Sequence, residues 1–149
     1  MGDFLQPWHI LILLVVAGFL LLPAIFYILT LRDAVNKCAP ASRTIDPGLI
    51  WLLLVPLVNL VFHFFVVLGL AQTLRNEFNR RGIRGAEPAP GQSIGLAMCI
   101  CACCGIIPLL GMLAVLAQLI LWIIYWVKIA EYSRKLDGEL LATPSGHVL

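Results

Sequence analysis

The chain has 149 residues, of which 61% are hydrophobic and 12% are charged, and its mean hydropathy is +0.98. Soluble globular domains are about 45–50% apolar and about 25% charged, so this composition excludes an ordinary soluble domain and is typical of a multi-spanning membrane protein. The net charge of +2 does not favour a nucleic-acid partner, and the basic residues are expected to meet the phosphates of membrane lipid instead.

The first predicted span covers residues 8–31, a run that contains Pro23 and no charged side chain. A helix needs about 20 mainly apolar residues to cross a hydrocarbon core that is ~30 Å thick. No basic residue precedes the run, so a retained span is expected rather than a cleaved signal peptide.

The second predicted span covers residues 49–71. Asp46 is expected to cap this helix, and Pro47 to occupy its first position, where the missing N–H of proline has no consequence.

The same helix is expected to continue beyond the membrane as far as Arg81. Glu77 precedes Arg80 by three residues and Arg81 by four, and this spacing predicts ion pairs along one helix face. Gly82 then predicts the helix end.

The next forty residues, Pro88–Val127, carry no charged side chain. As one helix they would be ~50–60 Å long, which exceeds the bilayer. A break at Gly105–Gly111, around Pro108, predicts two spans at 91–107 and 109–127 that form a tight hairpin. A re-entrant loop followed by a single span is the alternative.

The remaining segment, residues 128–137, is predicted to be a cytoplasmic helical tail that ends at Asp137–Gly138. Residues 143–149 are expected to be disordered. The predicted fold class is therefore all-α: residues 1–149 form a single domain, a polytopic transmembrane four-helix bundle.

Charge counting predicts the orientation of the four spans. The N-terminus, the 72–93 linker and the C-terminal tail would share one face with seven Lys and Arg, against three on the other face. The positive-inside rule then places both termini in the cytoplasm. The basic residues expected at lipid headgroups are Arg75, Arg80, Arg81, Lys128, Arg134 and Lys135.

One polar stripe is predicted inside the membrane. Leu52, Pro56, Asn59 and His63 are spaced by four, three and four residues, so they share one helix face. Gln118 lies near the middle of the fourth span. Because the second and fourth spans of a four-span bundle run parallel, Asn59 and Gln118 are expected at similar depth, with His63 one turn nearer the cytoplasm.

Three interpretations of Asn59, His63 and Gln118 remain open. Polar side chains in spans commonly form interhelical hydrogen bonds, each contributing about 0.6 kcal/mol, and this structural interpretation is favoured. A path for protons or small solutes is the second. Ligation of haem or chlorophyll through His63 is the third, although no cofactor is predicted.

Cys99, Cys101, Cys103 and Cys104 form a C-x-C-x-C-C cluster in the third span. On a helix Cys99 and Cys103 face one way and the other two face another, so four sulfurs do not converge on one ion. No metal site is predicted, and these residues are interpreted as small packing side chains. Cys38 has no evident partner.

Two segments, Arg43–Asn59 and Trp122–Ser133, resemble a family of small, uncharacterised bacterial multi-spanning membrane proteins. The resemblance covers roughly Arg32–Lys135. It implies a bacterial inner-membrane setting and the hairpin near Pro108, and it implies no activity.

The sequence contains no P-loop, no zinc-protease helix and no carboxylate pair within the membrane, so an enzyme is not predicted. The leading hypothesis is an accessory or scaffold subunit that packs against a larger membrane complex. The alternatives are a small-solute or proton transporter that uses Asn59, His63 and Gln118, and a cofactor-ligating subunit that uses His63.

Overall fold

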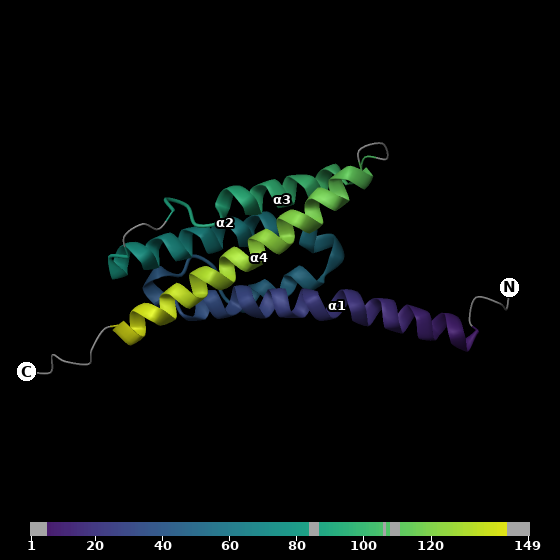
Figure 1. Cartoon of the computed structure of the whole chain (residues 1–149), viewed down its shortest axis with the longest axis horizontal. Coiled ribbons are helices and arrows are strands. Elements are labelled where there is room, and N and C mark those ends of the chain that lie inside the picture. The colour runs from purple at the N-terminus through teal and green to yellow at the C-terminus, as the bar shows by residue number, and fades with distance from the viewer. Residues whose placement is uncertain (1–5, 84–86, 106, 108–110, 143–149) are drawn as a thin grey trace, which may run out of the picture.

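The computed structural model describes residues 6–83, 87–105, 107 and 111–142 (Figure 1). These residues form helices and connecting segments, with no strand among them. The elements in chain order are α1 (Pro7–Asn36), the 3-10 helices η2 (Pro40–Ser42) and η3 (Leu49–Leu54), α2 (Pro56–Arg81), α3 (Gln92–Cys104) and α4 (Gly111–Ala142). Among the described residues, three segments are long and apolar enough to cross a membrane: Pro7–Asn36, Val58–Arg81 and Gly111–Gly138. The predicted all-α class is confirmed, and these three segments are candidates for membrane spans by length and composition.

Helix α1 starts at Pro7 and continues through Pro23 for 30 residues. It passes the predicted end at Leu31 because its last turns pack against α4, where Ile28, Leu31 and Val35 are buried. Its first half is uncovered: the segment from Trp8 to Leu22 is largely exposed, and a methyl group added to Gly18 would meet nothing within 4 Å.

The predicted start of the second span is wrong. The Asp46 carboxylate accepts the N–H of Gly48 at 2.6 Å, so it closes a local turn instead of capping a long helix. Residues 49–54 form a separate 3-10 helix, and α2 starts at Pro56, with Val55 as its extended N-cap. Pro56 therefore begins a helix, and the carbonyl of Leu52 accepts the N–H of Val55.

The far end of α2 is as predicted. Glu77 forms ion pairs with Arg80 and Arg81, and Gly82 ends the helix in the left-handed conformation with φ 67°. Such a φ suits glycine, which has no side chain to clash with the preceding turn.

Helices α1 and α2 run in the same direction. Tyr27 of α1 contacts His63 near the start of α2, whereas the N–H of Ala39, just after α1, donates to Glu77 near the end of α2. The segment between the helices therefore runs back along α2. Thr44 donates through its N–H to the Thr73 hydroxyl and through its own hydroxyl to the Gly69 carbonyl.

Helix α4 also runs parallel to α1. The Trp126 indole donates to Thr30 at one level, and Lys37 contacts Asp137 further along both helices. Figure 1 accordingly shows the start of α1 and the end of α4 at opposite ends of the molecule. The alternating four-span arrangement with both termini on one face is not supported by these contacts.

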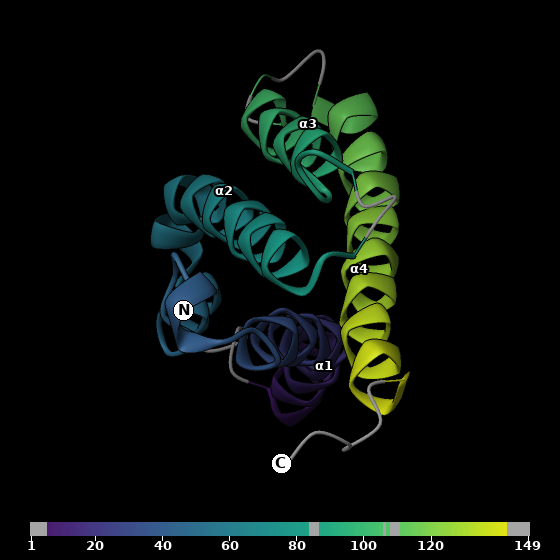
Figure 2. The same ribbon diagram turned by 90° about the vertical axis from the view of Figure 1, so that its left-hand side faces the viewer.

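Helix α3 runs antiparallel to α2 and α4 and is shorter than predicted. Its 13 residues span ~20 Å, less than the ~30 Å hydrocarbon core. Gly91 lies beside Ile129 and Gly95 lies between Val67 and Tyr125. Figure 2 shows α4 along one side of the molecule, with α3 beside its first part and α1 beside its last part. The predicted turn includes residues 106 and 108–110, which lie outside the described residues.

Helix α4 does not end at Asp137–Gly138 but continues to Ala142. Asp137 bonds to Lys37 of the α1 end, and this tertiary contact holds the turn in which a helix stop was predicted. The segment predicted to be disordered, residues 143–149, lies outside the described residues.

All Lys and Arg that the structure describes lie towards the common end where α1, α2 and α4 terminate. Arg32, Lys37 and Arg43 were predicted on the opposite face from Arg75 and Arg81. The hydrogen bond from Arg81 to the carbonyl of Lys37 excludes that division. Arg43 donates to the carbonyl of Cys38, next to Lys37, and so lies at the same end. We call this end the basic end.

Candidate functional site

A cavity of about 230 Å³ lies where α1, α2 and α4 meet, and we call it the central cavity. Three helices and η3 supply its walls, and the hydrogen-bonding side chains come from all three helices. The lining residues are Ala24, Tyr27, Ile28, Leu53, Asn59, His63, Gln118, Leu119 and Trp122.

A hydrogen bond between Tyr27 and His63 forms one side of the central cavity. The Tyr27 Oη and His63 Nε2 are 2.8 Å apart, and the Tyr27 side chain is 3% exposed. The bond joins α1 to α2 and occupies one ring nitrogen of His63, which leaves Nδ1 as the nitrogen open to a further ligand.

The oxygen atoms of the two amide side chains in the cavity are buried without a described hydrogen-bond partner, although both residues are only half-buried. Asn59 Oδ1 and Gln118 Oε1 have almost no accessible surface, and no described residue donates to either. Exchanging the oxygen and nitrogen of either amide would leave an NH2 group there instead. A buried polar group without a partner costs about 1–3 kcal/mol of stability. Two such groups on one cavity therefore mark a site suited to a hydroxyl or amide side chain, which can donate a hydrogen bond and also accept one.

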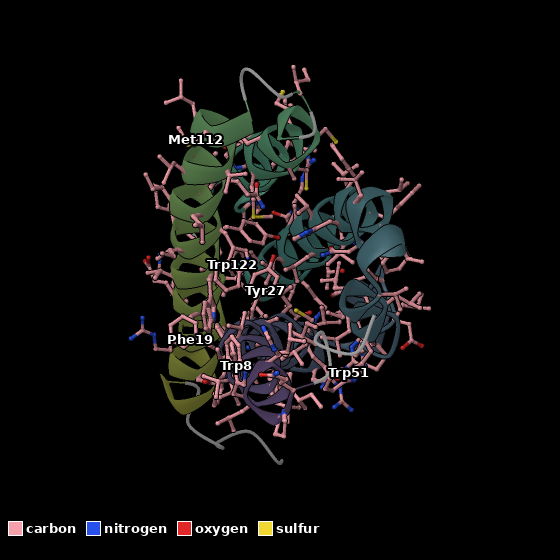
Figure 3. The ribbon with its side chains drawn as sticks, turned by 90° about the vertical axis from the view of Figure 1, so that its right-hand side faces the viewer. Trp8, Phe19, Tyr27, Trp51, Met112 and Trp122 are labelled. Atoms are coloured by element: carbon pink, nitrogen blue, oxygen red, sulfur yellow. The ribbon has the colours of Figure 1, made fainter. Side chains whose placement is uncertain are left out.

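Aromatic rings close the cavity on the side of the basic end. The ring centroid of Tyr27 lies 5.3 Å from the ring centroid of Trp122 and 6.1 Å from that of Trp126. Figure 3 shows Tyr27 and Trp122 together within the molecule, with Met112 at its edge. The positions of Trp122, Tyr125 and Trp126 in the sequence predict an aromatic belt at a membrane interface. Tyr125, however, is 1% exposed and packs in the interior.

The structure brings Asn59, His63 and Gln118 into one cavity, as the expected parallel pairing of their helices requires. The predicted stripe is only partly formed, since Leu52 lies outside α2. Sequence reasoning missed Tyr27. A signal for it exists: between Ile10 and Leu31, Tyr27 and Thr30 are the only side chains with hydrogen-bonding groups.

A second polar cluster lies at the basic end, around Glu77. The Glu77 side chain is fully buried and accepts hydrogen bonds from Arg80 at 2.6 Å, Arg81 at 2.6 Å and the N–H of Ala39 at 3.1 Å. Arg81 also donates to the carbonyls of Leu136 and Lys37 at 2.9 and 2.8 Å. One guanidinium thus ties together the ends of α1, α2 and α4.

Lys37 forms a third link between α1 and α4. Its Nζ lies 2.8 Å from Asp33, 2.6 Å from Asp137 and 2.9 Å from the Ser133 hydroxyl. Burial by itself would lower the pKa of Lys37, but the hydrogen bonds to Asp137 and Asp33 outweigh it and hold the pKa above its ordinary value. Lys37 is therefore a charged structural contact.

The basic residues predicted at lipid headgroups fall into two groups. Arg80, Arg81, Lys128 and Lys135 are ion-paired with carboxylates of the chain, and Arg81 is largely buried. Among the described residues, Arg75 and Arg134 form no ion pair, so neither guanidinium is balanced by a described carboxylate.

The cysteines do not form a metal site in the described part of the chain, where no three His, Cys, Asp or Glu side chains could hold an ion. Cys99 is buried in the core, and Cys101, Cys103 and Cys104 are half-buried. Burial raises the pKa of the Cys38 thiol to about 11, and this thiol donates to the carbonyl of Ala34. Cys38 is thus a protonated packing residue and not a reactive thiolate.

Comparisons of the chain with protein-family models, with curated proteins and with solved structures find no match.

Proposed function

We propose that this protein is a non-enzymatic subunit of a membrane complex and that the central cavity receives a hydrogen-bond-donating side chain from a partner's transmembrane helix. The observation that carries this proposal is that Asn59 and Gln118 line one cavity and that the oxygen of each amide has no partner among the described residues. Their cost to the isolated subunit is recovered when a partner supplies donors.

The chemistry of the cavity favours an uncharged occupant. Its described walls carry amide, phenol and imidazole groups and no carboxylate, so nothing there would balance a cation. Serine, threonine, asparagine and glutamine are the side chains that supply neutral donors between helices in membranes. A volume of about 230 Å³ accommodates one such side chain with neighbouring methyl groups.

The uncovered half of α1 supports a helical partner. Ala24, Tyr27 and Ile28 of α1 line the cavity, and the exposed Trp8–Leu22 segment precedes them on the same helix. A helix seated at the cavity would extend along this segment and pack closely at Gly18, where nothing lies within 4 Å.

The test combines two substitutions, Asn59→Leu and Gln118→Leu. We expect the double variant to lose a membrane protein that co-purifies with the wild type in mild detergent. The isolated double variant should be at least as stable as the wild type, because two unpartnered buried polar groups have been removed. Co-purification followed by mass spectrometry, together with thermal unfolding, measures both effects.

Val58→Leu and Ile120→Leu provide the matched control, since both side chains are exposed and neither lines the cavity. This control should keep the partner. A wild-type protein that purifies as a stable monomer with nothing bound would refute the proposal. A double variant less stable than the wild type would show that the amides pair within the chain.

We also propose an orientation in the membrane. The positive-inside rule places the basic end in the cytoplasm, and the resemblance of Arg43–Asn59 and Trp122–Ser133 to bacterial proteins suggests the inner membrane. Because α1 and α4 run parallel, the Pro7 end of α1 would then lie across the membrane from the C-terminal end of α4. This orientation replaces the expectation that both termini are cytoplasmic.

A further inference from the structure

A second cavity, of about 550 Å³, lies between α2 and the start of α3 at the basic end. Its wall on α2 carries Gln72, Arg75 and Asn79, and its wall on α3 carries Gln92. These residues offer a guanidinium and side-chain amides, and no carboxylate of the described residues lines the cavity. The donor set suits an anion with several oxygen acceptors.

Arg75 provides the unbalanced charge of this cavity. The described acidic side chains near the basic end are occupied elsewhere: Glu77 by Arg80 and Arg81, and Glu87 by Lys128. Arg75 is exposed and forms no ion pair with any residue that the structure describes. The start of α3, at Gln92, adds the positive end of a helix dipole to the same cavity.

The exposed face of α2 that leads up to the cavity indicates what kind of molecule would carry the anion. Six exposed residues follow one another on this face at spacings of four, three, four, three and four: Val61, Phe65, Leu68, Gln72, Arg75 and Asn79. The first three are apolar and the last three are polar. The side chains on this stripe therefore change from apolar to hydrogen-bonding within one helical turn. A phospholipid changes in the same way, from apolar acyl chains to a polar headgroup.

We propose that the α2–α3 cavity binds the phosphodiester headgroup of an anionic lipid, with Arg75 as the charged ligand and the acyl chain along Val61, Phe65 and Leu68. Basic pockets between transmembrane helices on the cytoplasmic side are suited to such headgroups. The guanidinium meets two phosphate oxygens at once, and the amides of Gln72, Asn79 and Gln92 can donate to the others.

The test measures which lipid the purified protein retains. Wild type and variants are reconstituted in vesicles of equal phosphatidylglycerol and phosphatidylcholine, extracted in mild detergent and analysed by native mass spectrometry. We expect the wild type to retain phosphatidylglycerol selectively and Arg75→Gln to retain about tenfold less, because the variant loses the charge-assisted hydrogen bonds to the phosphate. Arg75→Lys should retain an intermediate amount.

Arg134→Gln is the matched control, because Arg134 is also exposed and unpaired among the described residues but lies outside the cavity. It should retain phosphatidylglycerol as the wild type does. Equal retention by Arg75→Gln and Arg134→Gln would overturn the proposal, and so would retention of phosphatidylcholine equal to that of phosphatidylglycerol. Displacement of the lipid by millimolar inorganic phosphate would assign the cavity to a free anion and overturn the lipid assignment.

Discussion

Replacing Glu77 with Ala is expected to lower the free energy of unfolding by about 3–5 kcal/mol, the cost of breaking a buried ion pair by removing one partner. The variant leaves the guanidinium of Arg81, whose side chain is only 14% exposed, without its carboxylate. It also leaves the N–H of Ala39 without an acceptor. Because Arg81 joins the ends of three helices, the loss should affect the whole fold. Thermal unfolding in detergent, followed by tryptophan fluorescence, measures the effect.

Glu131→Ala is the control for this prediction. Glu131 forms the same i,i+4 type of pair, with Lys135, but both side chains are about half exposed, at 51% and 53%. Exposed pairs contribute little, so this variant should unfold at the wild-type temperature. Equal effects of the two substitutions would show that Glu77 is solvated and that its network does not hold the helix ends together.

Replacing Gly95 with Ala is expected to destabilise the protein by about 1–3 kcal/mol, as overpacking of a close-packed core does. The added Cβ would lie 2.5 Å from Val67 Cγ1 and 2.8 Å from Tyr125 Cε2, well inside van der Waals contact. Gly95 is where α3 approaches α2 and α4, so α3 must move away. Unfolding in detergent measures the change.

The control for this prediction is Gly18→Ala, in the uncovered part of α1, which adds a methyl group to open space. It should not destabilise the protein, because Ala is the better helix former. The double variant Gly95→Ala with Val67→Ala should lose less stability than the sum of the two single variants, since Val67→Ala removes one of the two clashing side chains. If Gly95→Ala were as stable as Gly18→Ala, the close packing of α3 on α2 would be wrong.

Local features of the fold were predictable because they depend on neighbouring residues. The ion pairs of Glu77 follow from helix periodicity, and the end of α2 follows from the left-handed conformation of Gly82. The start of α2 was not predictable by the same reasoning. Asp46–Pro47 and Val55–Pro56 both place a proline where a helix could start, and α2 starts at the second. The Asp46 carboxylate accepts the N–H of Gly48 in a local turn instead.

The direction of the helices was not predictable from local signals. Charge counting assumes that successive spans alternate, whereas the segment after α1 returns along α2 through the contacts of Thr44 with Gly69 and Thr73. These contacts join residues more than twenty positions apart, and no periodicity in the sequence encodes them. The structure still brings Asn59, His63 and Gln118 to one cavity, because their relative depth depends only on α2 and α4 running parallel.

The parallel packing of α1, α2 and α4 forms both the central cavity and the basic end, and cross-linking tests it most directly. In a background without the native cysteines, Lys37→Cys is paired either with Asp137→Cys or with Met112→Cys, and a short bifunctional thiol reagent is added. The Lys37 Nζ lies 2.6 Å from the Asp137 Oδ2, whereas Met112 is at the opposite end of α4. We therefore expect only the pair of cysteines at positions 37 and 137 to cross-link. Cross-linking of the Lys37–Met112 pair alone would show that α1 and α4 run antiparallel and would contradict the account.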